Sequence, residues 1–202
     1  LLGVNQSTAI TCVKPSGTVS QLVDSASGIH PRYSPYYLRT VRADKKDPLC
    51  DMMIDKGFHA EDDVMKPNDT KVIYFPMKSP ESSIMRDGKS AIEQLEIWKM
   101  YQLHWCEHKP SITVYVKEEE WLQVGAWVYE NFDVMSGVSF LPHSDHSYKQ
   151  APYQEVDKKT YQEWVTKTPR NINWMDLTQY EKEDTTTSSK ELACTAGACE
   201  IV

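Results

Sequence analysis

The chain has 202 residues, of which 40% are hydrophobic and 25% charged, so it can bury a core and has the composition of a globular protein. Its net charge of −7 argues against a broad electrostatic surface for nucleic acid, although local backbone dipoles can still bind a small anion. No apolar run approaches roughly 18 residues and no secretory signal opens the chain, so we expect neither a membrane span nor export. The five cysteines are then expected to be reduced thiols in the cytoplasm.

Two strands are expected in the first part of the chain. Residues 7–13, "STAITCV", are short, apolar and β-branched, which is typical of a buried strand. The stretch 14–20, "KPSGTVS", follows directly, so a strand, a loop and a short helix are predicted in succession. A second strand is expected over residues 71–77, ended by Pro76 and Pro80.

The middle of the chain alternates between helical and strand patterns. A helix is predicted over residues 88–108, a strand over 111–116, a second helix over 117–132 and another strand over 137–142. Strands and helices that alternate with short connections favour a parallel sheet with crossover helices, which is an α/β fold.

The end of the chain combines one more helix with a polar arm. The helix is expected to start near Asp157 and to stop at Pro169, and beyond Trp174 the residues have little to bury. We therefore expect an α/β body over residues 1–174 and a flexible tail over residues 175–202.

The stretch "KPSGTVS" is a candidate phosphate site. The residues that would form it are consecutive, and their backbone N–H groups at a helix start would make an anion cradle: Pro15, Ser16, Gly17, Thr18, Val19 and Ser20. Gly17 allows close approach, and the serine and threonine side chains supply hydroxyls. The G-x-x-x-x-G-K-[ST] spacing of a Walker loop is absent. From the chemistry alone, a phosphate site and an ordinary capped turn both remain open.

The tail carries a cysteine pair, Cys194 and Cys199, in "CTAGAC". Two thiols on a mobile arm can close into a disulfide and deliver reducing equivalents to another site. Zinc binding together with His104, Cys106 and His108 is a competing use. The pair lacks C-x₂-C spacing and one helix cannot aim all three of those residues at one ion, so we expect no metal.

Two further polar segments have open interpretations. His143, Asp145 and His146 follow a predicted strand, where they could line a pocket or form a polar loop. Residues 30–42, "HPRYSPYYLRTVR", mix aromatic side chains with arginines. In an acidic chain we favour packing plus a local anion contact over a nucleic-acid surface.

The ordered series of motifs resembles a known family. "ITCVKPSGTVSQLVDSASGIHPRYSPYYLRTVR", "KPSITVYVKEEEW", "GVSFLPHSDHSYKQAPY" and "CTAGAC" are similar to the C-terminal part of adenosylcobalamin-dependent (class II) ribonucleotide reductases, in particular the monomeric ribonucleoside-triphosphate reductase type of bacteria and their phages. The resemblance implies the later strands of a ten-stranded α/β barrel. It also implies that Pro15 to Ser20 hold the phosphates of a ribonucleotide substrate. Cys194 and Cys199 would re-reduce the active-site disulfide and be recharged by a thioredoxin-like protein.

One departure from the family limits what the chain can do alone. The radical cysteine of the family lies in an N-x-C-x-E motif, which this sequence lacks. With Leu rather than Met at position 1, we expect a C-terminal fragment or split subunit that needs an N-terminal reductase fragment, with adenosylcobalamin held mainly by that partner. It would work in the cytoplasm, that of the host bacterium if a phage encodes it. A non-catalytic scaffold subunit and a stand-alone thiol-redox module are the alternatives.

Overall fold

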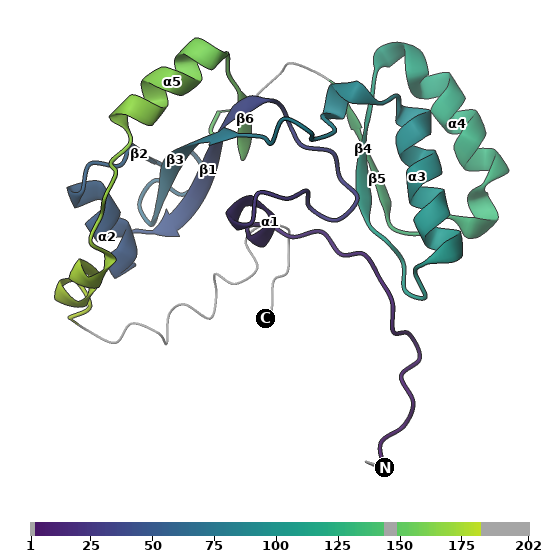
Figure 1. Ribbon diagram of the computed structural model, residues 1–202, viewed down its shortest axis with the longest axis horizontal. Helices are drawn as coiled ribbons and strands as arrows, with labels where there is room; N and C mark the ends of the chain where they lie inside the picture. The colour runs from purple at the N-terminus through teal and green to yellow at the C-terminus, as the bar shows by residue number, and fades with distance from the viewer. Residues whose placement is uncertain (1–2, 144–148, 183–202) are drawn as a thin grey trace. The chain divides into compact units, whose positions relative to one another are not determined.

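The computed structural model of the protein describes residues 3–143 and 149–182. These residues fold into two compact units, which are treated separately below (Figure 1). The first unit contains residues 3–35 and 79–143, and the second contains residues 36–78 and 149–182. In the described ranges, no helix combines the length and the apolar character that crossing a bilayer requires.

The first unit is built around a parallel pair of strands. Strand β4 (Ile112–Val116) pairs in parallel with β5 (Val138–Pro142), and α4 (Trp121–Glu130) lies between them in the sequence. This β-α-β order confirms the crossover arrangement predicted from the alternating patterns. The helix α3 (Ala91–His104) precedes β4, and the short α1 (Val19–Leu22) lies near the start of the chain.

Both long helices of the first unit cover one face of the parallel pair (Figure 1). Alternate residues of β4 are buried, so one side of the strand faces the helices. The core residues come from α3, β4 and α4: Ala91, Leu95, Trp98, Ile112, Val114, Val116, Val124 and Trp127. Trp98 is fully buried and its indole N–H donates to the carbonyl oxygen of Pro110 at 3.1 Å, so its polar atom is satisfied as well.

Local signals explain where α3 begins. Ser90 accepts a hydrogen bond from the backbone N–H of Glu93, while the Glu93 carboxylate accepts from the backbone N–H of Ser90, which is a capping box. The carboxylate of Glu120, in the 3₁₀ turn η2 (Glu118–Glu120), accepts from the N–H of Ala91. The acidic run before α4 therefore also caps the neighbouring helix.

The second unit contains a four-stranded antiparallel sheet in the order β2-β3-β1-β6. Strand β1 (Tyr36–Asp44) pairs with β3 (Thr70–Lys78) along its whole length, and β2 (Ala60–Asp62) and β6 (Tyr153–Glu155) are short outer strands. The sequence predicted β3 but not this antiparallel sheet. The described residues combine helices and strands, which confirms the predicted α/β class. Their strands form two small sheets, and the barrel stays a prediction.

Helices cover both faces of the antiparallel sheet (Figure 1). On one face, Ile73 packs with Cys50 and Met53 of α2 (Pro48–Asp55). On the other face, Val72 and Tyr74 pack with a tryptophan of α5 (Lys158–Lys167). Because consecutive residues of a strand face opposite sides, β3 supplies a core residue to each layer in turn.

Two strand predictions need correction. Residues 7–13 do not form a strand: Ile10 is 75% exposed, and the backbone of Thr11 bonds only to the segment near His108. β-branched composition favours extended backbone, but a strand also needs a ladder partner. Strand β3, conversely, continues through Pro76 to Lys78. Pro76 pairs with β1 on one side, and in the described chain β2 borders β3 only up to Ile73, so the missing N–H faces an unpaired side.

The last described residues differ from the expected loose arm. Trp174–Gln179 form the 3₁₀ helix η4, and Asp176 pairs with Lys56 near the end of α2. The hydroxyl of Tyr180 also donates to Asp55 at 3.2 Å. The predicted helix after Asp157 is confirmed as α5, whose first turn Asp157 caps by accepting from the N–H of Thr160.

Candidate functional site

The predicted phosphate loop is an open turn that leads into α1. Pro15, Gly17, Thr18 and Val19 are exposed, Ser16 is half-buried, and Ser20 is buried with 4% of its surface exposed. The Ser16 hydroxyl accepts from the backbone N–H of Ser20 at 3.1 Å. The predicted strand before the loop is absent, and the predicted short helix after it is present as a single turn.

The start of α1 presents backbone donors that no described residue uses. Among the described residues, nothing accepts a hydrogen bond from the backbone N–H of Thr18 or Val19, and Thr18 makes no side-chain cap. The buried hydroxyl of Ser20 also has no partner there. A methyl group at Gly17 would meet no atom within 4 Å, so space is open beside the backbone. Unsatisfied N–H groups at a helix start favour an anion.

Ser27 and Gly28 hold the predicted phosphate loop in place, and we call these two residues the brace. The Ser27 hydroxyl accepts from the N–H of Ser16 at 2.7 Å and donates to the Ser16 carbonyl oxygen at 2.9 Å. Gly28 has φ +60°, and a Cβ there would lie 3.0 Å from the carbonyl oxygen of Lys14. The turn at residues 27–28 therefore packs directly against the chain entering the loop. Sequence reasoning missed this brace.

The buried side chain of Arg32 holds in place the segment between the phosphate loop and the brace. Arg32 is 4% exposed, forms an ion pair with Asp24 at 2.9 Å, and donates to the carbonyl oxygen of Ser25 at 2.6 Å and to the Ser79 hydroxyl at 3.3 Å. A buried guanidinium is stabilised only when such partners surround it. Arg32 thus fixes the chain just after α1, which confirms the packing role expected for this arginine.

The other two arginines of the aromatic segment also serve packing within the second unit. Arg39 lies over the ring of Tyr153, with its guanidinium carbon 4.5 Å from the ring centroid. Arg42 pairs with Asp63 at 2.7 Å. The local anion contact expected for this segment is therefore a carboxylate of the chain itself.

Polar and aromatic side chains meet where β4 and β5 end. His143 follows β5, and its Nε2 lies 2.5 Å from the Asp87 carboxylate. Beside this pair, the ring of Tyr115 on β4 makes an edge contact with His143, and the Arg86 guanidinium lies 4.1 Å from the ring centroid of Tyr33. The carboxyl ends of parallel strands are where ligands bind in α/β proteins. His143 was singled out from the sequence, whereas nothing in the sequence pattern pointed to Asp87; Asp145 and His146 lie outside the described residues.

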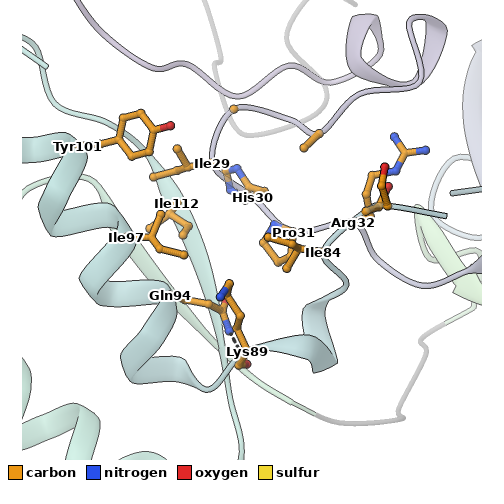
Figure 2. A pocket seen from close by; sticks show the side chains of 14 residues that line it. Ile29, His30, Pro31, Arg32, Ile84, Lys89, Gln94, Ile97, Tyr101 and Ile112 are labelled. Atoms are coloured by element: carbon orange, nitrogen blue, oxygen red, sulfur yellow. Dashed lines mark hydrogen bonds between the residues drawn. The ribbon is translucent and has the colours of Figure 1, made fainter. Parts of the chain in front are cut away.

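A pocket of about 340 Å³ lies elsewhere in the first unit, between α3 and the segment that follows the brace. Figure 2 shows the apolar side chains of Ile29, Ile97 and Ile112 close to one another in it. The amide of Gln94 donates to the carbonyl oxygen of Lys89, drawn as a dashed line (Figure 2). The volume of this pocket is near the lower limit for pockets that bind small molecules.

The cysteines separate into two groups. Cys194 and Cys199, the predicted redox pair, lie outside the described residues. Of the described cysteines, Cys12 is exposed, Cys106 is half-buried and Cys50 is buried. Burial raises the pKa of the Cys50 thiol, and the carboxylates of neighbouring aspartates raise it further, so Cys50 stays a protonated core thiol.

Comparison with known proteins identifies consistent relatives, although no family model matches the chain. It is 31% identical over 85% of its length to an adenosylcobalamin-dependent ribonucleoside-triphosphate reductase of Euglena gracilis. It is 29% identical over 99% of its length to the reductase of that name from Lactobacillus leichmannii. A probable adenosylcobalamin-dependent ribonucleoside-triphosphate reductase of Dictyostelium discoideum is 30% identical over the whole chain.

A solved structure agrees with these relatives. The crystal structure of a B12-dependent (class II) ribonucleotide reductase matches with a TM-score of 0.68 and 27% identity over 83% of this chain. The match covers 24% of that structure, and 24%, 28% and 26% of the three relatives in the order given. The chain therefore spans about a quarter of the relatives' length, and the resemblance inferred from the motifs is confirmed.

Proposed function

We propose that this chain is the C-terminal part of an adenosylcobalamin-dependent ribonucleoside-triphosphate reductase and works in ribonucleotide reduction. Most or all of the chain is homologous to a segment that makes up about a quarter of the length of such enzymes. Two tasks fall to it in this proposal. The loop from Pro15 to Ser20 holds the phosphates of the substrate, and the tail thiols restore the active site after each turnover.

The observation that carries the proposal is the pair of unused backbone donors in the loop. The N–H groups of Thr18 and Val19 have no acceptor among the described residues, and they open a helix beside the half-buried hydroxyl of Ser16. A phosphate oxygen is the acceptor that this arrangement suits, because two neighbouring N–H groups without partners among the described residues both carry partial positive charge. The relatives' name refers to ribonucleoside triphosphates, so we propose a triphosphate substrate.

The proposed role of the tail is electron transfer by thiol exchange. Reduction of a ribonucleotide leaves two active-site cysteines oxidised to a disulfide. The thiolate of Cys194 or Cys199 attacks that disulfide, the mixed disulfide is resolved by the other tail cysteine, and the tail pair ends as a disulfide. A thioredoxin-like dithiol then reduces the tail pair, so two electrons and two protons pass to the active site per turnover.

The cofactor is assigned to the enzyme as a whole and not to these residues. Adenosylcobalamin is far larger than the pocket of about 340 Å³ in the first unit, whose lining mixes isoleucines with polar and charged side chains. His143 bonds to Asp87 and is held beside Tyr115. The described residues therefore do not fit a complete cobalamin site, and we derive no step through the cofactor.

Reconstitution tests the function. The chain is mixed with a reductase segment that carries an N-x-C-x-E motif, adenosylcobalamin, a ribonucleoside triphosphate and a thioredoxin-like reductant, and deoxyribonucleotide is measured. Product that depends on this chain supports the proposal. A folded complex that binds substrate but forms no product would contradict it, and product formation that is indifferent to the tail cysteines would indicate a scaffold subunit instead.

A further inference from the structure

We propose that His30 is a positioning residue for the phosphate loop: its neutral imidazole ties the turn that braces Ser16 to strand β4. The inference rests on the proposed phosphate-binding function of the loop for its catalytic meaning, but the link itself is a property of the fold. It assigns a role to a residue that touches no part of the proposed substrate site.

The hydrogen-bond partners of His30 determine its protonation state. Nδ1 lies 2.7 Å from the carbonyl oxygen of Ser27, which can only accept, so Nδ1 carries the hydrogen. Nε2 lies 3.0 Å from the backbone nitrogen of Thr113, which can only donate, so Nε2 is unprotonated. His30 is therefore the neutral tautomer with hydrogen on Nδ1. A charged imidazolium could not accept from Thr113.

A continuous series of hydrogen bonds joins this ring to the phosphate loop. Ser27, whose carbonyl accepts from His30, also holds both backbone groups of Ser16 through its hydroxyl. Ser16 in turn accepts, through its own hydroxyl, from the N–H of Ser20 in the first turn of α1. The partners of Ser27 and His30 lie 11 and 83 residues away in sequence, so the ring connects the loop to a distant, well-packed strand.

Strand β4 is a rigid anchor for this connection. Ile112 and Val114, on either side of Thr113, are at most 2% exposed and belong to the core beneath α3 and α4. On the other side of the turn, Gly28 lies against the backbone of Lys14. The brace is thus held from both sides. A loop held in place before the ligand arrives loses less conformational freedom on binding, which increases affinity.

Three substitutions separate the two hydrogen bonds of the ring. His30→Ala removes both. His30→Gln places an amide oxygen near the position of Nε2 and can keep the bond to Thr113, whereas His30→Asn places an N–H near Nδ1 and can keep the bond to Ser27. Reach therefore makes Gln and Asn complementary half-replacements.

The first test uses the full chain and does not depend on reductase activity. Imidazole ¹⁵N spectra should show His30 with hydrogen on Nδ1, and hydrogen exchange of the Thr113 amide should accelerate about tenfold in His30→Ala and in His30→Asn, but less in His30→Gln. Amide shifts of Thr18 and Val19 are then followed while inorganic triphosphate is added. We expect the dissociation constant to rise about three- to tenfold in His30→Ala, with partial recovery in His30→Gln and His30→Asn.

The second test is kinetic and uses the reconstituted reductase. His30→Ala should raise the KM for the ribonucleotide by a similar factor and change kcat little, because a positioning residue acts on binding of the phosphates and not on the reacting atoms. A His30 with hydrogen on Nε2, or an unchanged triphosphate affinity in a folded His30→Ala chain, would overturn the proposal. Absence of any triphosphate effect on the wild-type amides would instead overturn the phosphate assignment of the loop, on which the role of His30 rests.

Discussion

The Ser27 hydroxyl satisfies both backbone groups of Ser16, accepting from its N–H at 2.7 Å and donating to its carbonyl oxygen at 2.9 Å. One side chain therefore sets the orientation of the peptide groups on either side of Ser16. Ser16 carries the first hydroxyl of the proposed phosphate loop, so the geometry of the loop depends on Ser27, a residue outside it.

Replacing Ser27 should lower the free energy of unfolding more than the loss of one small hydroxyl group suggests. Ser27→Ala leaves a half-buried N–H and a carbonyl oxygen of Ser16 without partners, which costs about 1–3 kcal/mol of unfolding free energy. Urea unfolding measures this loss. Ser25→Ala is the matched control, because its exposed hydroxyl bonds to no described residue, and it should change stability by less than about 0.5 kcal/mol. Equal effects of the two substitutions would refute the brace.

Replacement by alanine should destabilise the fold at one glycine and leave its stability nearly unchanged at another. Gly28→Ala forces a side chain into φ +60° with its Cβ 3.0 Å from the Lys14 carbonyl oxygen, so we expect a loss of about 1–3 kcal/mol in stability. Gly17→Ala meets no atom within 4 Å and should leave stability within about 0.5 kcal/mol. If Gly17 lies against phosphate, the same substitution should nevertheless reduce triphosphate affinity in a titration. A stable Gly28→Ala chain would show that the turn can move away from Lys14.

Acid should loosen the second unit through Asp63. Burial acts to raise the pKa of this carboxyl, but hydrogen bonds from the N–H groups of Lys66 and Met65 and the contact with Arg42 outweigh it and hold the pKa below its ordinary value. A lowered folded-state pKa means that the carboxylate stabilises the fold above the unfolded pKa of about 3.9, and that this stability is lost as pH falls through the lower, folded-state pKa. The protection of amides in β1 and β3 against hydrogen exchange, taken relative to the intrinsic exchange rate at each pH, should therefore fall from about pH 5 downward.

Asp63→Asn supplies the comparison for this acid effect. The variant should be less stable than wild type near neutral pH, by about 1–3 kcal/mol, because Arg42 loses its charged partner. Its stability should also depend less on pH below about pH 4. Asp69→Asn, an exposed change nearby, should keep the wild-type pH dependence. An unaltered acid profile in Asp63→Asn would assign the effect to other carboxylates.

The tail cysteines should be required for repeated turnover but not for the first. In the reconstituted reductase, Cys194→Ser with Cys199→Ser should leave single-turnover product intact and abolish sustained turnover with a thioredoxin-like reductant. A small dithiol that reaches the active site directly should restore it. Cys12→Ser, which changes an exposed thiol in the described part of the chain, is the matched control and should behave as wild type. Sustained turnover by the double variant with the protein reductant would rule out the shuttle.

The sequence predicted the first unit better than the second. β4, α4 and β5 follow each other with regular apolar periods and short connections, so local pattern and tertiary contact agree there. β1 was missed because its residues face two helical layers and carry arginines: Tyr37 and Leu38 are both buried, and Arg39 and Arg42 are accommodated by partners far away in sequence. A strand buried on both faces lacks the alternation that identifies half-buried strands.

The site divides in the same way. The proposed phosphate loop could be predicted from the sequence because its residues are contiguous, and its glycine and hydroxyl groups have a recognisable chemistry. The brace at Ser27 and the link through His30 were not found, because a hydrogen bond to Thr113 depends on how the chain returns across 83 residues. Such contacts follow from packing, which a single sequence does not display.

Pro76 also affects how readily copies of this chain aggregate. It lies in β3 beyond the end of β2, where no described strand pairs with the outer side of β3. An exposed strand edge is a template on which another copy can add by backbone pairing, and aggregation then begins. A proline removes the donor that an incoming strand would need at that point. The residue that the sequence pattern marks as a strand breaker thus protects a strand that continues through it.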